Sequence, residues 1–211
     1  MTNKNTSVHG VPRRRILQTG VVAVGGLGMA GNVAARGRGV TTETEDVLSQ
    51  MPGEVDCPAG FNVEGERDVV SEEGATLRRT RNGISCQVQM PTPAPGEYIY
   101  PCPGATATDE VGQPEAFTLW VFVFDDPDDD DWTGAFLGSG HLTGGAGTLT
   151  LSGYISTNTE PFAGEQLSNP EDARVHLAVA PHGALNPDLM PGQIQTPAGP
   201  SPYVWWIALF D

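Results

Sequence analysis

The alternation of apolar and polar residues along the chain constrains its fold more than any other feature. The segment F-T-L-W-V-F-V-F at residues 117–124 is apolar on both faces when extended, which predicts a central β-strand that is covered on both sides. The segment I-S-C-Q-V-Q-M at residues 84–90 alternates strictly, as a strand does when only one of its faces is buried. Because no window repeats apolar residues every three to four positions, we expect an all-β chain with little helix.

Six further segments have the composition of strands, at residues 76–81, 97–100, 135–142, 148–156, 174–180 and 203–210. The dipeptide Asn82-Gly83 predicts a two-residue type I′ hairpin turn, since both residues accept positive φ. Gly (27) and Pro (18) supply long loops between the strands. We therefore expect a single antiparallel β-sandwich or open barrel. The strands at 117–124 and 203–210 are apolar on both faces and need a cover, which loops, the N-terminal leader or a second subunit in a homo-oligomer would supply.

The first 35 residues have the layout of an export signal. A basic start, P-R-R-R-I-L-Q at residues 12–18, precedes a weakly apolar Gly/Ala-rich stretch and a small-residue exit at residues 33–35. The pair Arg13-Arg14 resembles a twin-arginine signal, which implies the twin-arginine (Tat) translocase as a partner and cleavage after Ala35. No stretch approaches the ~18 uninterrupted apolar residues of a membrane span. The mature protein is therefore expected to be secreted and to carry no transmembrane segment.

The expected mature chain is strongly acidic. All 26 Asp and Glu residues follow position 35, where seven Arg and no Lys remain, so the formal charge is 7 − 26 = −19. At molar salt the Debye length falls to about 3 Å, and dense carboxylates stay hydrated without repelling one another. The composition therefore favours a halophilic protein, and the summed negative field argues against nucleic acid as a partner.

The domain boundaries follow from the change in composition after the signal. Residues 36–54 are polar and acidic and are expected to form a flexible leader, within which T-T-E-T-E-D-V-L at residues 41–48 is a candidate short helix. The β domain is expected to span residues 55–211.

Three histidines of the mature chain are candidate ligands for copper or zinc. His176 lies in the strand predicted at 174–180, His182 follows that strand, and His141 lies in the segment 135–142. Neutral imidazole is the commonest metal ligand, so a metal-dependent enzyme or redox protein is one alternative. The spacing argues against it, because the chain has no C-x-x-C or H-x-H pair and no Cys close to a His. The competing interpretation places His141 and His182 in turns and His176 on a strand face.

An acidic loop follows the central strand. Residues 125–131 read D-D-P-D-D-D-D, and the carboxylates of Asp126, Asp128 and Asp130 are candidate calcium ligands, since Ca²⁺ takes six to eight oxygens at flexible geometry. The loop does not fit the EF-hand spacing. A solvated loop without metal is the expected structure in so acidic a chain.

The three cysteines allow one internal disulfide. Cys57 and Cys102 both precede proline in turn-like contexts, which favours the pairing Cys57–Cys102 in an exported protein. Cys86 lies on the buried side of the strand at 84–90, where a free thiol behaves as a small hydrophobic group. The pairing Cys86–Cys102 remains open as an alternative.

Enzyme motifs are scarce. No G-x-S-x-G elbow is present, and a chain without lysine beyond Lys4 has no Walker loop or Schiff-base lysine in its mature part. A pair of glycosidase carboxylates has no sequence signature, so a secreted hydrolase stays as an alternative. Four aromatic residues are candidates for a sugar-stacking surface: Trp132, Tyr203, Trp205 and Trp206.

Residues 141–210 carry a resemblance. The segments L-T-L-S-G-Y-I-S-T-N-T, R-V-H-L-A-V-A-P-H-G-A-L-N-P-D-L and Y-V-W-W-I-A-L-F-D resemble uncharacterised exported proteins of haloarchaea. The segment H-L-A-V-A-P-H-G is also similar to the histidine-bearing strand of CHRD-type extracellular β domains, although the H-x-H pair of that family is here only His176 followed by Leu177 and Ala178. The resemblance implies an extracellular β domain and identifies no catalytic residue. The sequence thus favours a secreted, non-enzymatic binding or structural module at the cell surface, with a polysaccharide or protein of that surface as its partner.

Overall fold

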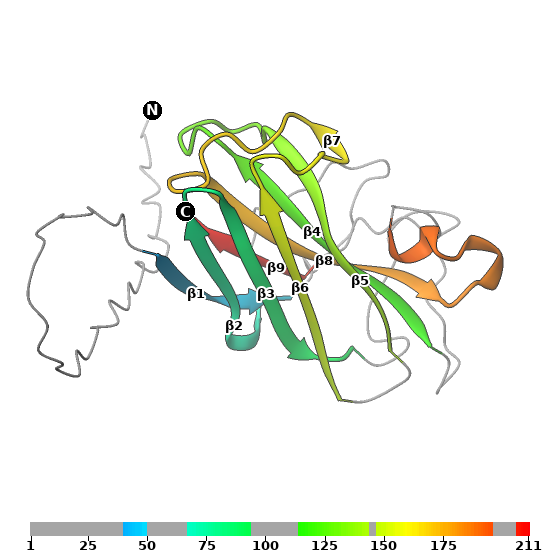
Figure 1. Cartoon of the computed structure of the whole chain (residues 1–211). Coiled ribbons are helices and arrows are strands. Elements are labelled where there is room, and N and C mark those ends of the chain that lie inside the picture. The colour runs from blue at the N-terminus through cyan, green and yellow to red at the C-terminus, as the bar shows by residue number, and fades with distance from the viewer. Residues whose placement is uncertain (1–39, 50–66, 94–113, 144–146, 196–205) are drawn as a thin grey trace, which may run out of the picture.

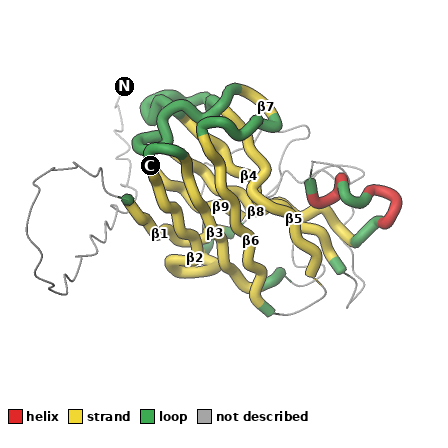
Figure 2. Tube along the Cα trace, viewed as in Figure 1, coloured by secondary structure: helices red, strands yellow, loops and turns green. Residues whose placement is uncertain are grey.

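A computed structural model describes residues 40–49, 67–93, 114–143, 147–195 and 206–211 of the chain. In this part the chain forms one antiparallel sheet of nine strands, in the order β6-β3-β2-β1-β9-β8-β4-β5-β7 (Figure 1). The strands are β1 (Thr41–Leu48), β2 (Val69–Thr80), β3 (Gly83–Pro91), β4 (Glu115–Phe124), β5 (Gly134–Thr143), β6 (Thr148–Ser156), β7 (Ala163–Gly164), β8 (Arg174–Ala184) and β9 (Trp206–Phe210). The helices of the described residues are two 3₁₀ turns, η1 (Pro187–Leu189) and η2 (Gly192–Ile194), and no helix there is able to cross a membrane (Figure 2). The predicted all-β fold is confirmed.

The sheet curls until strands from its two ends lie side by side. β6 is the last strand at one end, and β5 lies near the other, yet the Ser152 amide donates to Ser139 Oγ at 3.2 Å. Glycine permits this approach, because a Cβ added at Gly153 would lie 2.7 Å from the Cα of Gly138. The result is a half-barrel in which the four strands β6-β3-β2-β1 face the five strands β9-β8-β4-β5-β7.

The interior of the half-barrel is the hydrophobic core. Alternate residues of the strands point into it, as the period of two requires. β4 contributes Phe117, Leu119, Val121 and Val123, all of them buried. The strand predicted at 84–90 buries Ile84, Cys86, Val88 and Met90, so its predicted inward face is confirmed.

The other face of β4, β8 and β9 is apolar as well, and loops cover part of it. Trp120, Ala178, Ala180 and Ile207 form a second buried cluster there. Phe162, from the loop between β6 and β7, packs edge-on against Trp120 with ring centroids 5.1 Å apart. The sequence left loops, the leader or a second subunit as possible covers for this apolar face. In the described residues, a loop covers part of it.

The β domain begins earlier than the predicted residue 55, because β1 at residues 41–48 is part of its sheet. The expected helix or flexible leader over residues 41–48 is wrong, because this segment pairs with β2 from Thr41↔Arg79 to Leu48↔Val69 and meets β9 at Leu48↔Ile207. The β-branched threonines of T-T-E-T-E-D-V-L suit a pleated strand. Val47 is buried in the core, and β1 joins the two halves of the sheet.

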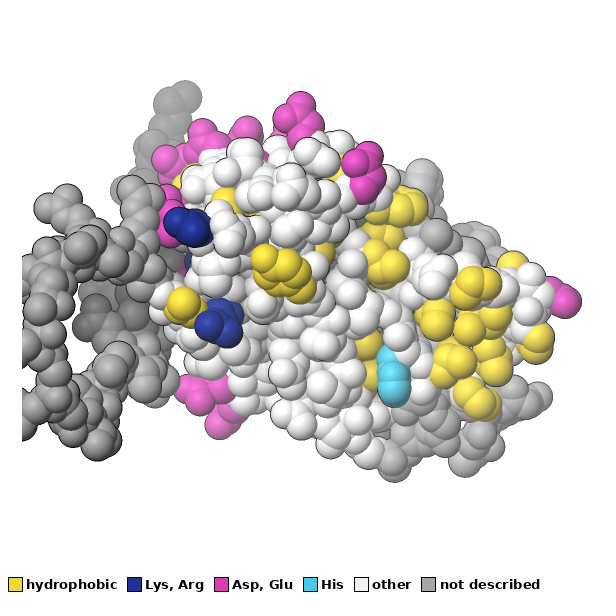
Figure 3. All heavy atoms as spheres, in the orientation of Figure 1, with side chains coloured by type: hydrophobic (Ala, Val, Ile, Leu, Met, Phe, Trp, Pro, Cys, Tyr) yellow, Lys and Arg dark blue, Asp and Glu magenta, His cyan; other side chains and the backbone are white. Residues whose placement is uncertain are grey.

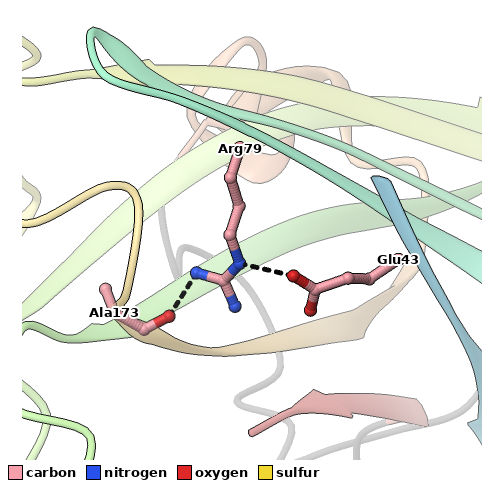
Figure 4. Close-up of polar contacts among 3 residues, drawn as sticks. All are labelled: Glu43, Arg79 and Ala173. Atoms are coloured by element: carbon pink, nitrogen blue, oxygen red, sulfur yellow. Dashed lines mark hydrogen bonds and ion pairs between the residues drawn. The ribbon is translucent and has the colours of Figure 1, made fainter. Parts of the chain in front are cut away.

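A buried ion pair attaches β1 to the rest of the fold. Arg79 Nε donates to Glu43 Oε1 at 2.9 Å, and the two side chains are 4% and 7% exposed. Arg79 Nη1 also donates to the carbonyl of Ala173, just before β8 (Figure 4). Three segments that are distant in sequence thus meet at one guanidinium inside the half-barrel.

The remaining strand predictions are largely confirmed. The hairpin at 76–90 forms, but its two-residue turn is Arg81-Asn82, and Gly83 is the first residue of β3, where a Cβ would lie 2.3 Å from the carbonyl oxygen of Ile155. The last strand is central, between β1 and β8, with Trp206 in the core. The strand predicted at 97–100 lies outside the described residues, as do Tyr203 and Trp205.

Candidate binding face

The structure does not bring the three histidines together. His176 and His182 lie six residues apart on β8, which separates them by about 20 Å at 3.3 Å per residue. Both are buried, whereas His141 on β5 is exposed. Within the described ranges, no three His, Cys, Asp or Glu side chains form a group that could hold a metal ion. His141, His176 and His182 therefore do not form a shared copper or zinc site.

His182 instead belongs to a buried polar cluster. Its Nε2 lies 2.7 Å from Thr118 Oγ1, and its Nδ1 has no hydrogen-bond partner. Burial lowers the pKa of His182 to about 4, so the imidazole is neutral. The buried amide of Gln193 donates to the carbonyls of His182 and Ala184 at 3.1 and 2.8 Å. This cluster holds the segment with η1 and η2 against the outer side of β8.

His176 has a packing role. Its ring lies 4.6 Å from the ring of Phe124, and the Arg174 guanidinium lies 4.1 Å from the centre of the same ring. Burial, and then the Arg174 charge, lower the pKa of His176 to about 4. Its predicted position on a strand face is confirmed.

The acidic loop forms turns with its own backbone. Asp126 Oδ1 accepts the amide of Asp128 at 3.1 Å, and Asp129 Oδ1 accepts the amide of Asp131 at 3.3 Å. Asp125 accepts the amides of Ser168 and Asn169, which joins the loop to the segment before β8. Among the described residues no group of three or more His, Cys, Asp or Glu could hold a metal ion, so Asp126, Asp128 and Asp130 do not converge as a calcium site would require.

Cys86 is a free, buried thiol, so the alternative pairing Cys86–Cys102 is not formed. Its Sγ lies 3.6 Å from the carbonyl oxygen of Gly153, and burial raises its pKa to about 12. A thiol of that pKa is protonated at neutral pH and is a poor nucleophile. Cys57 and Cys102 lie outside the described residues.

The outer side of β2, β3 and β6 carries a different surface, which we call the polar face. Because the apolar residues of these strands point into the core, their alternate residues point outward. The polar face consists of Thr76, Arg78, Ser85, Gln87, Gln89, Thr148, Thr150, Ser152 and Tyr154. Eight of these nine side chains are uncharged, and none is acidic.

Strand register aligns these side chains in rows. Gln87 lies opposite Ser152 on β6 and Thr76 on β2, and Gln89 lies opposite Thr150. Neighbouring rows are about 7 Å apart along a strand, and neighbouring strands are about 4.8 Å apart. From Thr148 to Tyr154 the polar face is about 20 Å long, and across three strands it is about 10 Å wide.

Tyr154 ends this face near the β2–β3 turn. Its side chain is 55% exposed, and its hydroxyl lies 3.5 Å from the carbonyl oxygen of Asn82. Ser85 lies opposite it on β3, and Arg78 lies opposite Ser85 on β2. The row thus presents an aromatic ring, a hydroxyl and a guanidinium side by side.

The polar face contrasts with the rest of the molecule. In Figure 3 the surface over β3 and β6 is mostly white, whereas acidic side chains gather along the upper rim, with a further group at the lower left. The loops after β4, after β6 and before β8 carry the exposed acidic residues Asp126, Asp128, Asp129, Asp130, Asp131, Glu160, Glu165 and Asp172. None of the nine side chains of the polar face is acidic, and the exposed Glu72 and Glu73 of β2 lie beyond Gly74, outside this face.

The polar face has no signature in the sequence. The pattern T-L-T-L-S-G-Y-I-S contains its outward row, but only the pairing of β3 with β6, more than 60 residues apart, sets that row beside Gln87 and Gln89. Of the predicted aromatic surface, Trp132 is 41% exposed beside Phe122, whereas Trp206 is in the core.

The fold is an antiparallel half-barrel, and the polar face is a patch without acidic side chains on its outer side. Comparison of the chain with protein-family models, with curated proteins and with solved structures finds no match.

Proposed function

We propose that this protein is an exported, halophilic binding module that acts without catalysis at the cell surface, and that the polar face is its binding surface. The observation that supports this is that none of the nine outward side chains of the polar face is acidic, in a chain with net charge −15. The exposed Glu72 and Glu73 of β2 lie beyond Gly74, outside this face. Dense carboxylates keep a surface hydrated and repel most macromolecules. A face without them is where a partner is able to approach closely.

The alternatives have less support from the described residues. A metal-dependent enzyme would need converging ligands, and the histidines and the acidic loop do not provide them. A hydrolase would need paired carboxylates over a substrate site. The polar face offers amides and hydroxyls instead, which recognise a ligand without activating water.

Adhesion to the envelope tests the proposal. Gln87→Glu places one carboxylate at the centre of the polar face, and Gln166→Glu adds the same charge at an exposed loop position outside it. Fluorescently labelled mature protein should bind envelope fragments of the producing cells in molar salt. Gln87→Glu should bind at least about tenfold more weakly, because a carboxylate in such a contact is desolvated without a partner, whereas Gln166→Glu should bind as wild type does. Equal adhesion by both variants would refute the assignment of this face.

The export part of the proposal rests on Arg13-Arg14. Replacing both with Lys should leave full-length precursor in the cytoplasm, since a twin-arginine receptor reads this pair. Normal secretion of the double variant would overturn the twin-arginine route.

A further inference from the structure

We infer that the partner of the polar face is an uncharged polysaccharide, whose sugar rings stack on Tyr154 and bond to the amides of Gln87 and Gln89. This inference rests on the proposed function and names the ligand class of the same face. It follows from the donors and acceptors on the face, from its charge, from its shape and from the position of its one aromatic ring.

The hydrogen-bonding groups of the face match a polyhydroxylated ligand. Each Gln offers two donors and an acceptor, and each Ser or Thr hydroxyl both donates and accepts. Sugar hydroxyls also do both, so either partner can supply the donor. Gln87, Gln89, Thr150 and Ser152 are exposed and lie in adjacent register positions on β3 and β6.

Charge excludes the charged polymers. The acidic rim and the net charge of −15 repel an anionic chain, and the face itself carries Arg78 as its one cation. A cationic chain would be drawn to the acidic loop at residues 126–131 and to Glu72 and Glu73 on β2, and away from the nine residues of the polar face. A neutral polymer is neither repelled by the acidic residues nor attracted to them, so the polar face is its favoured binding position.

The shape of the face favours a polymer over a single sugar. The outer side of a sheet is a shallow platform about 20 Å long here, and several sugar units in sequence are needed to contact all its rows. Small ligands usually bind in concave sites that bury most of their surface.

Tyr154 supplies the apolar contact. Its ring is 55% exposed at one end of the platform, and its hydroxyl is 3.5 Å from the Asn82 carbonyl oxygen, which positions it at the β2–β3 turn. Aromatic rings with a polar end combine a large apolar contact area with little loss of side-chain freedom.

A second copy of the chain fits the face less well. Interfaces between identical subunits are built around an apolar, densely packed centre. Tyr154 is the one large apolar side chain of the nine, and the remaining eight are polar. Hydrated ligands with their own hydroxyls suit such a surface better.

Titration calorimetry with defined polysaccharides in 1 and 3 M NaCl tests the inference. Soluble galactomannan, mixed-linkage β-glucan and amylose serve as neutral probes, and alginate and chitosan as charged probes. We expect binding to at least one neutral probe and to neither charged probe, with affinity unchanged between the two salt concentrations because no ion pair is screened.

Variants connect the binding to the face. Tyr154→Ala should weaken binding about tenfold or more, as truncating an aromatic anchor does, while Tyr154→Phe should keep most of it. Trp132→Ala removes an exposed aromatic outside the polar face and should leave binding unchanged. Thermal melts identify any variant that fails to fold, and Tyr154→Phe remains informative in that case. Binding confined to charged probes, or an unchanged affinity in Tyr154→Ala, would overturn the inference.

Envelope treatments separate the two proposals. If periodate, which cleaves vicinal diols of sugars, removes adhesion that Gln87→Glu also removes, both proposals are supported. If protease removes that adhesion and periodate does not, the polar face is a binding surface but its ligand is a protein, and the polysaccharide inference fails alone. If Gln87→Glu adheres as wild type does, the proposed function itself fails.

Discussion

The ion pair between Glu43 and Arg79 provides the sharpest test of how β1 is held in the fold. The perturbation is Glu43→Ala, which removes the carboxylate that lies 2.9 Å from Arg79 Nε and leaves a guanidinium 4% exposed inside the half-barrel. Breaking a buried pair by removing one partner costs about 3–5 kcal/mol, because the remaining charge stays desolvated. A domain is usually stable by about 5–15 kcal/mol, so the loss should be a large part of the free energy of unfolding.

Companion variants separate the charge from the packing. Glu43→Gln keeps a side-chain oxygen for Arg79 but loses the charge assistance, so its penalty should be smaller than that of Glu43→Ala. Replacing the pair with Glu43→Leu and Arg79→Met together should be close to neutral, since apolar groups of similar volume need no partner. Arg78→Ala, next to Arg79 but exposed, should stay within about 0.5 kcal/mol of wild type.

Urea unfolding followed by tryptophan fluorescence at 1 and 3 M NaCl measures these penalties. The Glu43→Ala penalty should be the same at both salt concentrations, because a buried pair is screened far less than a surface one. A penalty below about 1 kcal/mol, or one that disappears as salt rises, would show that the pair is solvated and would refute the reasoning.

Three further predictions follow from other parts of the structure. Gly140→Ala should destabilise the fold by about 1–3 kcal/mol in thermal or urea melts, since a Cβ there would lie 1.9 Å from the Ile194 carbonyl oxygen; a variant that unfolds as wild type does would contradict this contact. The pKa of His182 falls from about 6.5 when unfolded to about 4 when buried, so stability should be fully present above pH 6.5 and decline from there toward pH 4. His182→Asn should reduce this slope in urea midpoints measured from pH 4 to 8, and an unchanged slope would argue against it. Lowering NaCl from molar to about 0.1 M should lower the melting temperature by circular dichroism, because the Debye length widens to about 10 Å and surface carboxylates repel one another; melts that do not move with salt would contradict the halophilic assignment.

The sequence predicted strands where alternation or continuous apolarity was strong. The segments at 84–90, 117–124, 148–156 and 174–180 all lie within strands of the structure. The prediction for residues 41–48 was wrong because the strand there buries a charged residue, Glu43. Its carboxylate accepts a hydrogen bond from Arg79, 36 residues away, which makes this burial possible. No local pattern indicates that a glutamate will point into a core.

The start of β3 and the polar face also depend on contacts between distant segments, which the sequence alone does not show. Asn82-Gly83 marked the hairpin correctly, but the close approach of Gly83 to β6 decided which residue begins β3. The polar face depends on which strands are neighbours, and β3 pairs with β6 across a long intervening segment. Residues such as Gln87 and Ser152 are ordinary exposed polar residues in the sequence, and they become a surface only through this non-local register.

The position of β1 and β9 as neighbours has a consequence for biosynthesis. The first and last strands described meet at the centre of the sheet, so the half-barrel cannot be completed until the C-terminal residues have left the ribosome. A fold whose pairings join strands as distant in sequence as β1 and β9 is also expected to form slowly. A nascent chain would therefore keep an open sheet centre until β9 emerges, which makes the time before β9 is available the stage at which chaperones would have most effect.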